Sequence, residues 1–390
     1  MSEKVFYLVS VPASSAPSGG DPESQLENWY SETLGLKTGS DINSFAIPSF
    51  KIGTLDSLVQ QSEDLAKLDA QYQGVVSKIA DIISTLYDGN PASIASAKKI
   101  KDQPPQDYVK TFTWNTNKFR TDKSIPDLVD LISKETFALD NDVKTGYSTY
   151  TAAKANLSTI DRKQTGNLSI RSLHDVVRRE HFVLDSEYLV TVLTAVPKSQ
   201  SKEFLSSYET IVPMVVPRSA SVIAQDDEYI LYNTTLFKKY APEFSLKSRE
   251  HKWIPREFHY SEALVEDLKK EQQVAAQAER KQWADIVRLS RTAYADVVAN
   301  WTHLKAIRMF VEAVLRYGLP PNFVNTSLYF PAKNIKKVED ALVAKFGYLS
   351  GNAFQKDKKG NLKTDSDLHE YGALVDTDYK PFVYYELDLF

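Results

Sequence analysis

The chain has 390 residues, of which 42% are hydrophobic and 25% are charged, as is typical of a soluble globular protein with two or three packed units. A formal net charge of −4 gives no electrostatic support for a nucleic-acid-binding protein. The chain has no cysteine, which excludes disulfides and cysteine nucleophiles and fits a reducing cytosol. No apolar stretch approaches the ~20 residues that span a bilayer, so we expect no direct membrane insertion.

The chain begins with a predicted strand at residues 5–11. These residues are apolar at successive positions, which suits a central strand that is buried on both faces, and Pro12 ends the run. A signal peptide is the alternative, but the apolar run is short and an acidic residue precedes it. The strand is the better interpretation.

The first long helix is predicted to begin near Ser124, with Pro126 and Asp127 in its opening turn, and to end at Gly166. Its apolar residues recur at spacings of three and four, which places them in one stripe along the helix. They are Ile125, Leu128, Leu131, Ile132, Leu139, Val143, Tyr150, Leu157 and Ile160.

Residues 167–260 show a different pattern, with short apolar runs in place of one long helical stripe. Residues 187–196 and 228–237 read as two strands, and residues 202–211 as a short helix between them. The region therefore resembles a small α/β unit of its own.

The second long helix is predicted from Ser261 to Gly318, where two prolines forbid its continuation. An unbroken helix of that length would span roughly 85 Å. Residues 269–282 are polar all round, which is typical of a connector through solvent, whereas the apolar stripe becomes dense from Trp283 onward. This pattern predicts a helix that leaves one body and enters a second.

Two further strands are predicted near the C-terminal end, at residues 326–330 and 383–389. Pairing them with the N-terminal strand would place both ends of the chain in one body. We therefore predict an α+β fold with the shape of an elongated dumbbell, in which a helical neck joins two α/β lobes. The foot comprises residues 1–150 and 287–390, the neck residues 151–166 and 261–286, and the head residues 167–260.

Motifs for catalysis are not found in the sequence. It contains no phosphate-binding loop, no dinucleotide-binding glycine motif and no Gly-x-Ser-x-Gly elbow. Ser172, His174 and Asp175 lie close in sequence, but residues so near one another rarely converge as a catalytic triad, so a turn or a capped helix start is expected. The acidic triplet at residues 226–228 is expected to form a solvated turn. We predict no catalytic residues.

Metal and cofactor sites are not predicted either. The histidines lack ligand spacing, and His369 with Glu370 lacks the second histidine of a zincin helix. Residues 357–367 resemble a calcium loop only superficially, because lysines occupy ligand positions, so a solvated loop is expected. Two basic pairs, Arg178 with Arg179 and Lys238 with Lys239, indicate a solvated face or, alternatively, contact with an acidic partner.

Several segments together resemble one known family, the C subunit of the vacuolar-type proton ATPase (V-ATPase), and a fungal member most of all. The matches run in order along nearly the whole chain, and the set is specific although no single motif is. They are FKIGTLD (50–56), DKSI (122–125), TGNLSIRSLHD (165–175), PRSASVIA (217–224), IPREF (254–258), LRYGLPP (315–321), GNAF (351–354), DKKG (357–360) and LVDTDYKPFV (374–383).

The resemblance implies a non-catalytic stator subunit with a foot, a neck and a head. Its implied partners are the E–G peripheral stalk heterodimers, one of them held at the head, and the cytosolic N-terminal domain of the membrane-embedded a subunit. It implies a role in proton transport and vacuole acidification, a cytoplasmic location on the vacuolar and endomembrane surface, and release during regulated disassembly. Actin binding and phosphorylation are also associated with the family. A cytoskeletal or scaffolding adaptor is the alternative, and an enzyme with an unrecognised site a weaker one.

Overall fold

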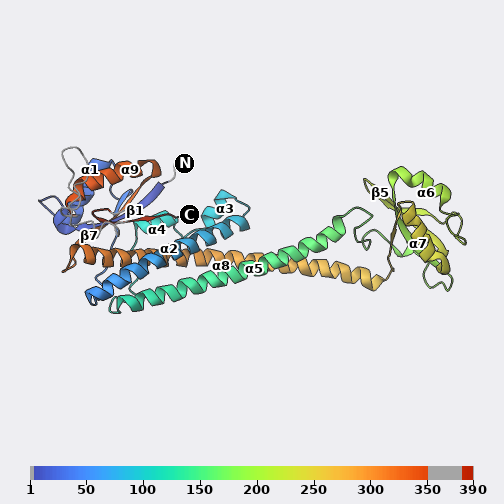
Figure 1. Cartoon of the computed structure of the whole chain (residues 1–390), viewed down its shortest axis with the longest axis horizontal. Coiled ribbons are helices and arrows are strands. Elements are labelled where there is room, and N and C mark those ends of the chain that lie inside the picture. The colour runs from blue at the N-terminus through green and yellow to red at the C-terminus, as the bar shows by residue number, and fades with distance from the viewer. Residues whose placement is uncertain (1–3, 350–379, 390) are drawn as a thin grey trace, which may run out of the picture. The chain divides into compact units, whose positions relative to one another are not determined.

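The computed structural model describes residues 4–349 and 380–389 (Figure 1). The chain divides into two compact units, Met1–Gly146 with Ile286–Phe390 (unit 1) and Tyr147–Asp285 (unit 2). Both boundaries fall inside long helices, α5 (Ile125–Thr165) and α8 (Glu262–Tyr317). These bounds confirm the two predicted long helices. The dumbbell shape and the division into foot, neck and head stay predictions.

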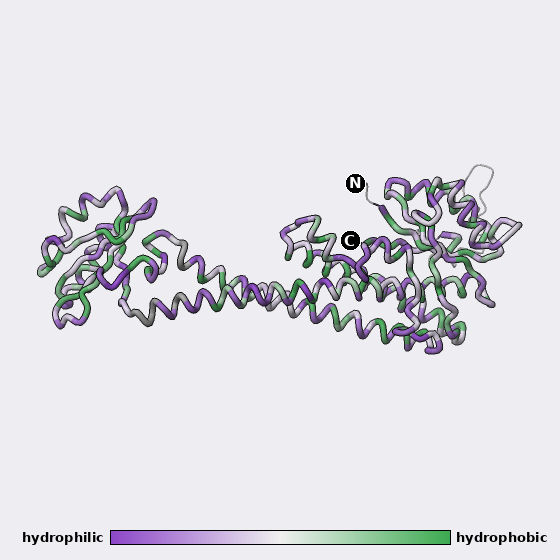
Figure 2. Tube along the Cα trace, turned by 180° about the vertical axis from the view of Figure 1, so that it is seen from behind, coloured by the Kyte–Doolittle hydropathy of each residue, from purple (hydrophilic) through white to green (hydrophobic). Residues whose placement is uncertain are grey.

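Unit 1 contains a four-stranded antiparallel sheet in the order β2-β7-β1-β8. The predicted strands at both ends of the chain are confirmed, and they pair in one sheet as expected, with β1 in its centre and β8 at its edge. In Figure 2 the stretch of chain that follows the N label, where β1 begins, is mostly green and hence hydrophobic. The strands are β1 (Lys4–Pro12), β2 (Ile42–Ser44), β7 (Phe323–Pro331) and β8 (Val383–Leu387).

The unit 1 sheet is covered on both faces, which explains the unbroken hydrophobic run from Val5 to Val9 in β1. Helices α1 (Pro22–Leu34) and α9 (Ile335–Phe346) pack on the face that carries Tyr7. The opposite face, which carries the buried Leu8, lies toward α8 (Figure 1). There the Tyr317 hydroxyl of α8 donates a hydrogen bond of 2.9 Å to the Ser10 carbonyl.

Like α1 and α9, three further helices of unit 1 were not predicted from the sequence: α2 (Leu55–Leu86), α3 (Pro91–Ala97) and α4 (Pro105–Lys110). Side-chain N-caps fix where α2 and α3 begin. The Thr54 hydroxyl accepts a hydrogen bond from the Ser57 N–H, and the Asn90 side chain accepts one from the Ala92 N–H. Helix α2 contributes a long buried stripe to the unit 1 core.

Unit 2 also contains a four-stranded antiparallel sheet, in the order β4-β5-β3-β6. The two predicted strands are confirmed as β3 and β5. The predicted helix at 202–211 ends earlier, at Ser207, where a turn closed by the Thr210 N–H on the Ser207 carbonyl replaces it. The elements are β3 (Leu189–Pro197), α6 (Ser201–Ser207), β4 (Ser221–Gln225), β5 (Tyr229–Phe237), α7 (Ala241–Glu250) and β6 (Ile254–Arg256).

The unit 2 sheet separates two small cores. On one face, Phe204 of α6 and Phe244 of α7 pack with Trp253 against β3 and β5. On the other face, Leu168 and Leu173 from the segment before β3 cover Leu193 and its neighbours. Unit 2 therefore has its own buried core, as expected from the strands and the short helix that its sequence predicts.

The two sheets share one connectivity. Each sheet is built from two copies of one pattern, in which a nine-residue strand is followed by a three-residue 3-10 turn, a helix and a short strand. In unit 1 the two copies run from β1 to β2 and from β7 to β8, and in unit 2 they run from β3 to β4 and from β5 to β6. This order is the βαββαβ arrangement of split β-α-β folds. The 3-10 turns are η1 (Ala13–Ser15), η3 (Lys198–Gln200), η4 (Lys238–Tyr240) and η5 (Ala332–Asn334), and η2 (Arg179–His181) lies outside the repeat.

Candidate partner-binding surfaces

The part of the chain that the structure describes holds no group of histidine, aspartate and glutamate side chains that could bind a metal ion. Among its helices, none is both long and apolar enough to cross a bilayer. Residues 357–367, His369 and Glu370 lie outside the described residues.

Ser172, His174 and Asp175 contact one another within a turn, as the sequence predicts. Ser172 Oγ lies 2.8 Å from His174 Nδ1, and Asp175 Oδ2 lies 3.2 Å from Nε2. The Nε2 contact lacks hydrogen-bond geometry. A hydrolase triad places serine on Nε2 and the acid on Nδ1, so this arrangement is reversed. The contacts hold a turn together.

Asp226 begins the turn that joins β4 to β5 and holds it in place. Its carboxylate accepts backbone hydrogen bonds from Tyr229 at 2.6 Å, Leu168 at 2.5 Å and Glu228 at 2.9 Å. Partial burial acts to raise the pKa of Asp226, but the three N–H donors together keep it below its usual value. The acidic triplet therefore forms a structured turn.

His303 is buried on α8 inside an aromatic cage. The Asn115 N–H donates to its Nε2 at 3.1 Å, and its Nδ1 lies 2.7 Å from the Ala299 carbonyl, so the ring is neutral with its proton on Nδ1. Burial lowers the pKa of His303 to about 4. Its role is to connect α8 with the loop after α4.

A buried ion cluster joins α2, α8 and β8 in unit 1. Asp69 accepts hydrogen bonds from Trp301 Nε1 at 2.6 Å and from Lys305 Nζ at 2.9 Å, and it also pairs with Arg308. Lys305 Nζ donates in addition to the Glu386 carbonyl of β8 at 2.9 Å. No local sequence pattern predicts this cluster, because its members come from distant segments.

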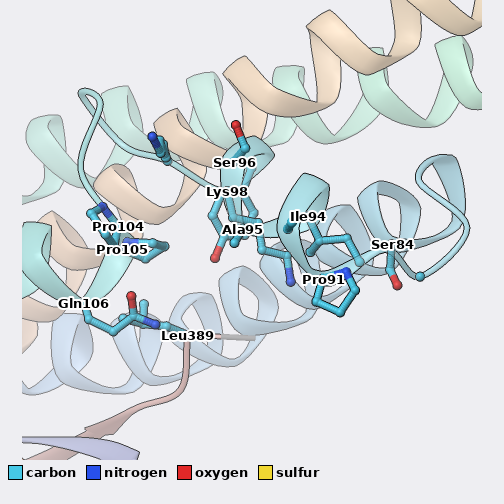
Figure 3. Close-up of a pocket in the computed structure, with 14 residues that line it drawn as sticks. Ser84, Pro91, Ile94, Ala95, Ser96, Lys98, Pro104, Pro105, Gln106 and Leu389 are labelled. Carbon is cyan, nitrogen blue, oxygen red and sulfur yellow. The ribbon is translucent and has the colours of Figure 1, made fainter.

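Unit 1 carries a cleft of about 750 Å³ beside α3, which we name the α3 cleft (Figure 3). Prolines and small residues form much of its wall, and the buried Tyr294 of α8 lines it. Burial lowers the pKa of Lys98, whose Nζ lies 5.8 Å from the centre of the Tyr294 ring. Labelled lining residues in Figure 3 include Pro91, Ile94, Pro104, Pro105, Gln106 and Leu389.

Unit 2 carries a larger groove, of about 920 Å³, which we name the β3-edge groove. It runs between β3, α7 and the chain that follows β6. Its apolar walls include Val183, Leu184, Val190, Val192, Leu246 and Phe258.

Both basic pairs singled out in the sequence contribute to cavities of unit 2. Lys238 lines the β3-edge groove, and its Nζ donates to the Ser186 carbonyl at 2.6 Å. Arg178 and Arg179 line an adjoining cavity that shares Phe182 and Leu184 with the groove. The position of these pairs is compatible with contact to an acidic partner.

Comparisons with known proteins identify the family. The family model described as the C subunit of V-ATPase matches residues 6–383. The chain is 49% identical over 385 residues to the C subunit of the V-type proton ATPase of Saccharomyces cerevisiae, a match that covers 98% of this chain and 97% of that relative. This chain belongs to the V-ATPase C subunit family.

Other members of the C subunit family are more distant. Identity is 36% over 386 residues to the V-type proton ATPase C subunit of Manduca sexta and 35% over 384 residues to the C 1 subunit of Rattus norvegicus, with 98% of this chain and 97% of each relative covered. A solved cytoplasmic N-terminal domain of the V-ATPase I subunit, a homolog of the a subunit, aligns over 88% of this chain and 98% of that chain. The TM-score of 0.27 and the identity of 14% are too low to indicate a shared fold.

Membership in the C subunit family confirms the resemblance read from the motifs. The chain is a non-catalytic V-ATPase subunit, and the ATPase activity of the complex lies in other subunits. The α3 cleft and the β3-edge groove are candidate surfaces for contact with other subunits.

Proposed function

We propose that this C subunit is a stator linker of the V-ATPase. In this role it connects the E–G peripheral stalk heterodimers to the cytosolic N-terminal domain of the membrane-embedded a subunit. The observation that carries the proposal is 49% identity to a yeast C subunit over 98% of the chain. The connector must resist torque, because the catalytic part of a rotary motor would otherwise turn with the rotor.

The link between the two units supports a mechanical role. The chain passes from one unit to the other inside α5 and again inside α8, so two uninterrupted helices join them. Backbone hydrogen bonds hold each residue of a helix, whereas a glycine- and serine-rich linker behaves as a random coil. Helices transmit torque that such a linker would absorb.

The separation of the candidate surfaces supports two binding events. The α3 cleft belongs to unit 1 and the β3-edge groove to unit 2. We assign an E–G heterodimer to unit 2, and a second stalk contact and the a subunit to unit 1. Divided binding suits a reversible stator, because each contact raises the effective concentration of the other and losing one weakens the whole.

Reconstitution tests the function directly. Purified chain is added to V-ATPase that lacks its C subunit, and co-purification with the E, G and a subunits is measured together with ATP-driven proton pumping. We expect all three partners to co-purify and pumping to recover. Failure to bind E–G, combined with co-sedimentation with actin filaments, would favour the adaptor alternative.

Cell fractionation tests the regulated assembly and the location. In cells whose only C subunit is this chain, we expect it on vacuolar membranes in nutrient-rich medium and in the cytosol after glucose withdrawal. A membrane-bound fraction that does not change with nutrients would contradict the regulatory part of the proposal.

A further inference from the structure

The shared connectivity of the two sheets allows them to be aligned residue by residue. Lys4 of β1 pairs with Pro331, and Leu189 of β3 pairs with Phe237, so the two nine-residue strands correspond position by position. Phe6 then corresponds to Thr191. In unit 1 the fourth strand β8 pairs with Phe6 and the next four residues of β1.

The fourth strand is shorter in unit 2. β6 pairs only with residues 193–195, which correspond to residues 8–10 of β1. No described strand takes the positions beside Thr191 and Val192 that Leu387 and Glu386 occupy beside β1. Part of the β3 edge is therefore open. Open edges are known sites for the addition of a partner strand.

Side-chain burial also differs between the two sheets. Val5 and Tyr7 of β1 are 6% and 2% exposed, and the Tyr384 ring of β8 packs 5.6 Å from the Tyr7 ring. Their counterparts Val190 and Val192 are only half-buried and line the β3-edge groove. Unit 1 thus shows the covered form of a surface that unit 2 leaves uncovered.

Exposed apolar side chains extend this surface. Leu246 of α7 is 59% exposed, and Val183 and Leu184 on the other side of the groove are 39% and 36% exposed. Large aliphatic side chains gathered around one groove are typical of a binding site for another protein.

The charges at the groove select the kind of partner. Lys238, Arg249 and Arg256 line it together with Glu257, and the adjoining cavity adds Arg178, Arg179 and Glu180. The Arg256 guanidinium is engaged by the carbonyls of Leu168 and Arg171, whereas Arg249 is exposed. The basic excess favours acidic side chains on the partner.

We propose that the β3-edge groove binds an extended partner segment that carries apolar side chains flanked by acidic ones and that adds to the open edge of β3. This inference rests on the proposed function, in which unit 2 binds an E–G heterodimer, and it locates that contact. The partner segment takes the place beside Thr191 and Val192 that β8 takes beside Phe6 and Tyr7.

Calorimetric titration of the full chain with a purified E–G heterodimer tests the site. Leu246→Glu puts a charge on the apolar wall, and Arg249→Glu reverses the exposed cation, so each is expected to weaken binding at least tenfold. The matched controls lie on α6, outside the groove lining: Leu205→Glu, at a side chain 48% exposed, and Lys202→Glu, at a cation on the same helix. Both controls are expected to bind within about twofold of the unchanged chain.

Amide hydrogen exchange on the same complex tests the mode of binding. We expect E–G to slow exchange at the Thr191 amide, because a strand added to an edge protects the amides that face it. The neighbouring Val190 and Val192 amides face β5 instead, and the Leu189 N–H donates to Ser186 Oγ. Absence of binding by the unchanged chain would overturn the proposed function. If it binds but the groove variants bind like their controls, or the Thr191 amide gains no protection, the β3-edge groove is not the site and the proposed function stands.

Discussion

At the scale of single residues, Asp69 holds together charges that would otherwise be buried without a partner. Lys305 is 5% exposed, and burial lowers its pKa against the opposing effect of Asp69. Removing one partner from a buried ion pair usually costs about 3 to 5 kcal/mol, because the remaining charge is left uncompensated.

We therefore expect Asp69→Asn to lower the free energy of unfolding by about 3 to 5 kcal/mol, as measured by urea denaturation. The control is Asp64→Asn on the same helix, where an exposed carboxylate lies 3.9 Å from Lys67 Nζ. Its expected cost is below about 1 kcal/mol. Equal effects of the two substitutions would show that the cluster does not stabilise the fold.

His303 should make stability depend on pH. Its pKa is about 4 in the folded chain against 6.5 in the unfolded chain, so between these values the unfolded state binds more protons. The contribution of His303 to the free energy of unfolding is therefore present above about pH 6.5 and is lost as the pH falls from there toward 4. The expected loss at pH 5 relative to pH 7 is about 2 kcal/mol.

Urea denaturation at pH 7 and pH 5 measures this effect. In the His303→Gln variant the loss between the two pH values should be smaller by about 2 kcal/mol, whatever its stability at pH 7. In His259→Gln, at an exposed histidine, the loss should match that of the unchanged chain. An unaltered pH dependence in His303→Gln would contradict a buried neutral histidine.

Contacts between residues that are distant in the sequence could not be predicted from the sequence alone. Asp69 and Lys305 are separated by 236 positions, and no local pattern marks either as buried and paired. Conversely, Ser172 and His174 are close in the sequence, and their contact belongs to a turn, as expected because triads usually assemble from distant segments. Only the folded chain distinguishes a turn from a site.

At the scale of elements, β8 is expected to stabilise unit 1. It pairs with β1 from Phe6 to Ser10, and its Tyr385 ring lies 4.2 Å from the Arg308 guanidinium carbon. Deleting residues 383–390 should therefore speed amide exchange in β1 and β7, while β3 and β5 of unit 2 stay protected. Equal loss in both sheets, or no loss, would contradict two separate cores.

The elements differ in how far the sequence could predict them. Helices α5 and α8 were predictable because long apolar stripes and clear end signals coincide. Helix α2 carries a similar signal, with Leu58, Leu65, Tyr72 and Ile79 spaced seven residues apart, and could have been found. Strand β6 could not, because three residues that include Pro255 are too short to show a period.

At the scale of the whole molecule, the dumbbell shape can be tested in solution. A compact chain of 390 residues would have a radius of gyration of about 21 Å. If α5 and α8 hold the units apart, small-angle scattering should give a clearly larger value and a distance distribution with a second maximum. A single symmetric maximum at the compact value would rule the dumbbell out.

The order of strands along the chain has a consequence for biosynthesis. Lys4 pairs with Pro331, whereas the pairing of β3 with β5 is complete within residues 189–237. At ribosomal rates of roughly 5 to 20 residues per second, β1 leaves the ribosome roughly 15 to 65 seconds before β7. During that interval the sheet of unit 2 can already close. The nascent chain thus carries an unpaired apolar strand at its leading end, and we expect chaperones to shield it until translation is nearly finished.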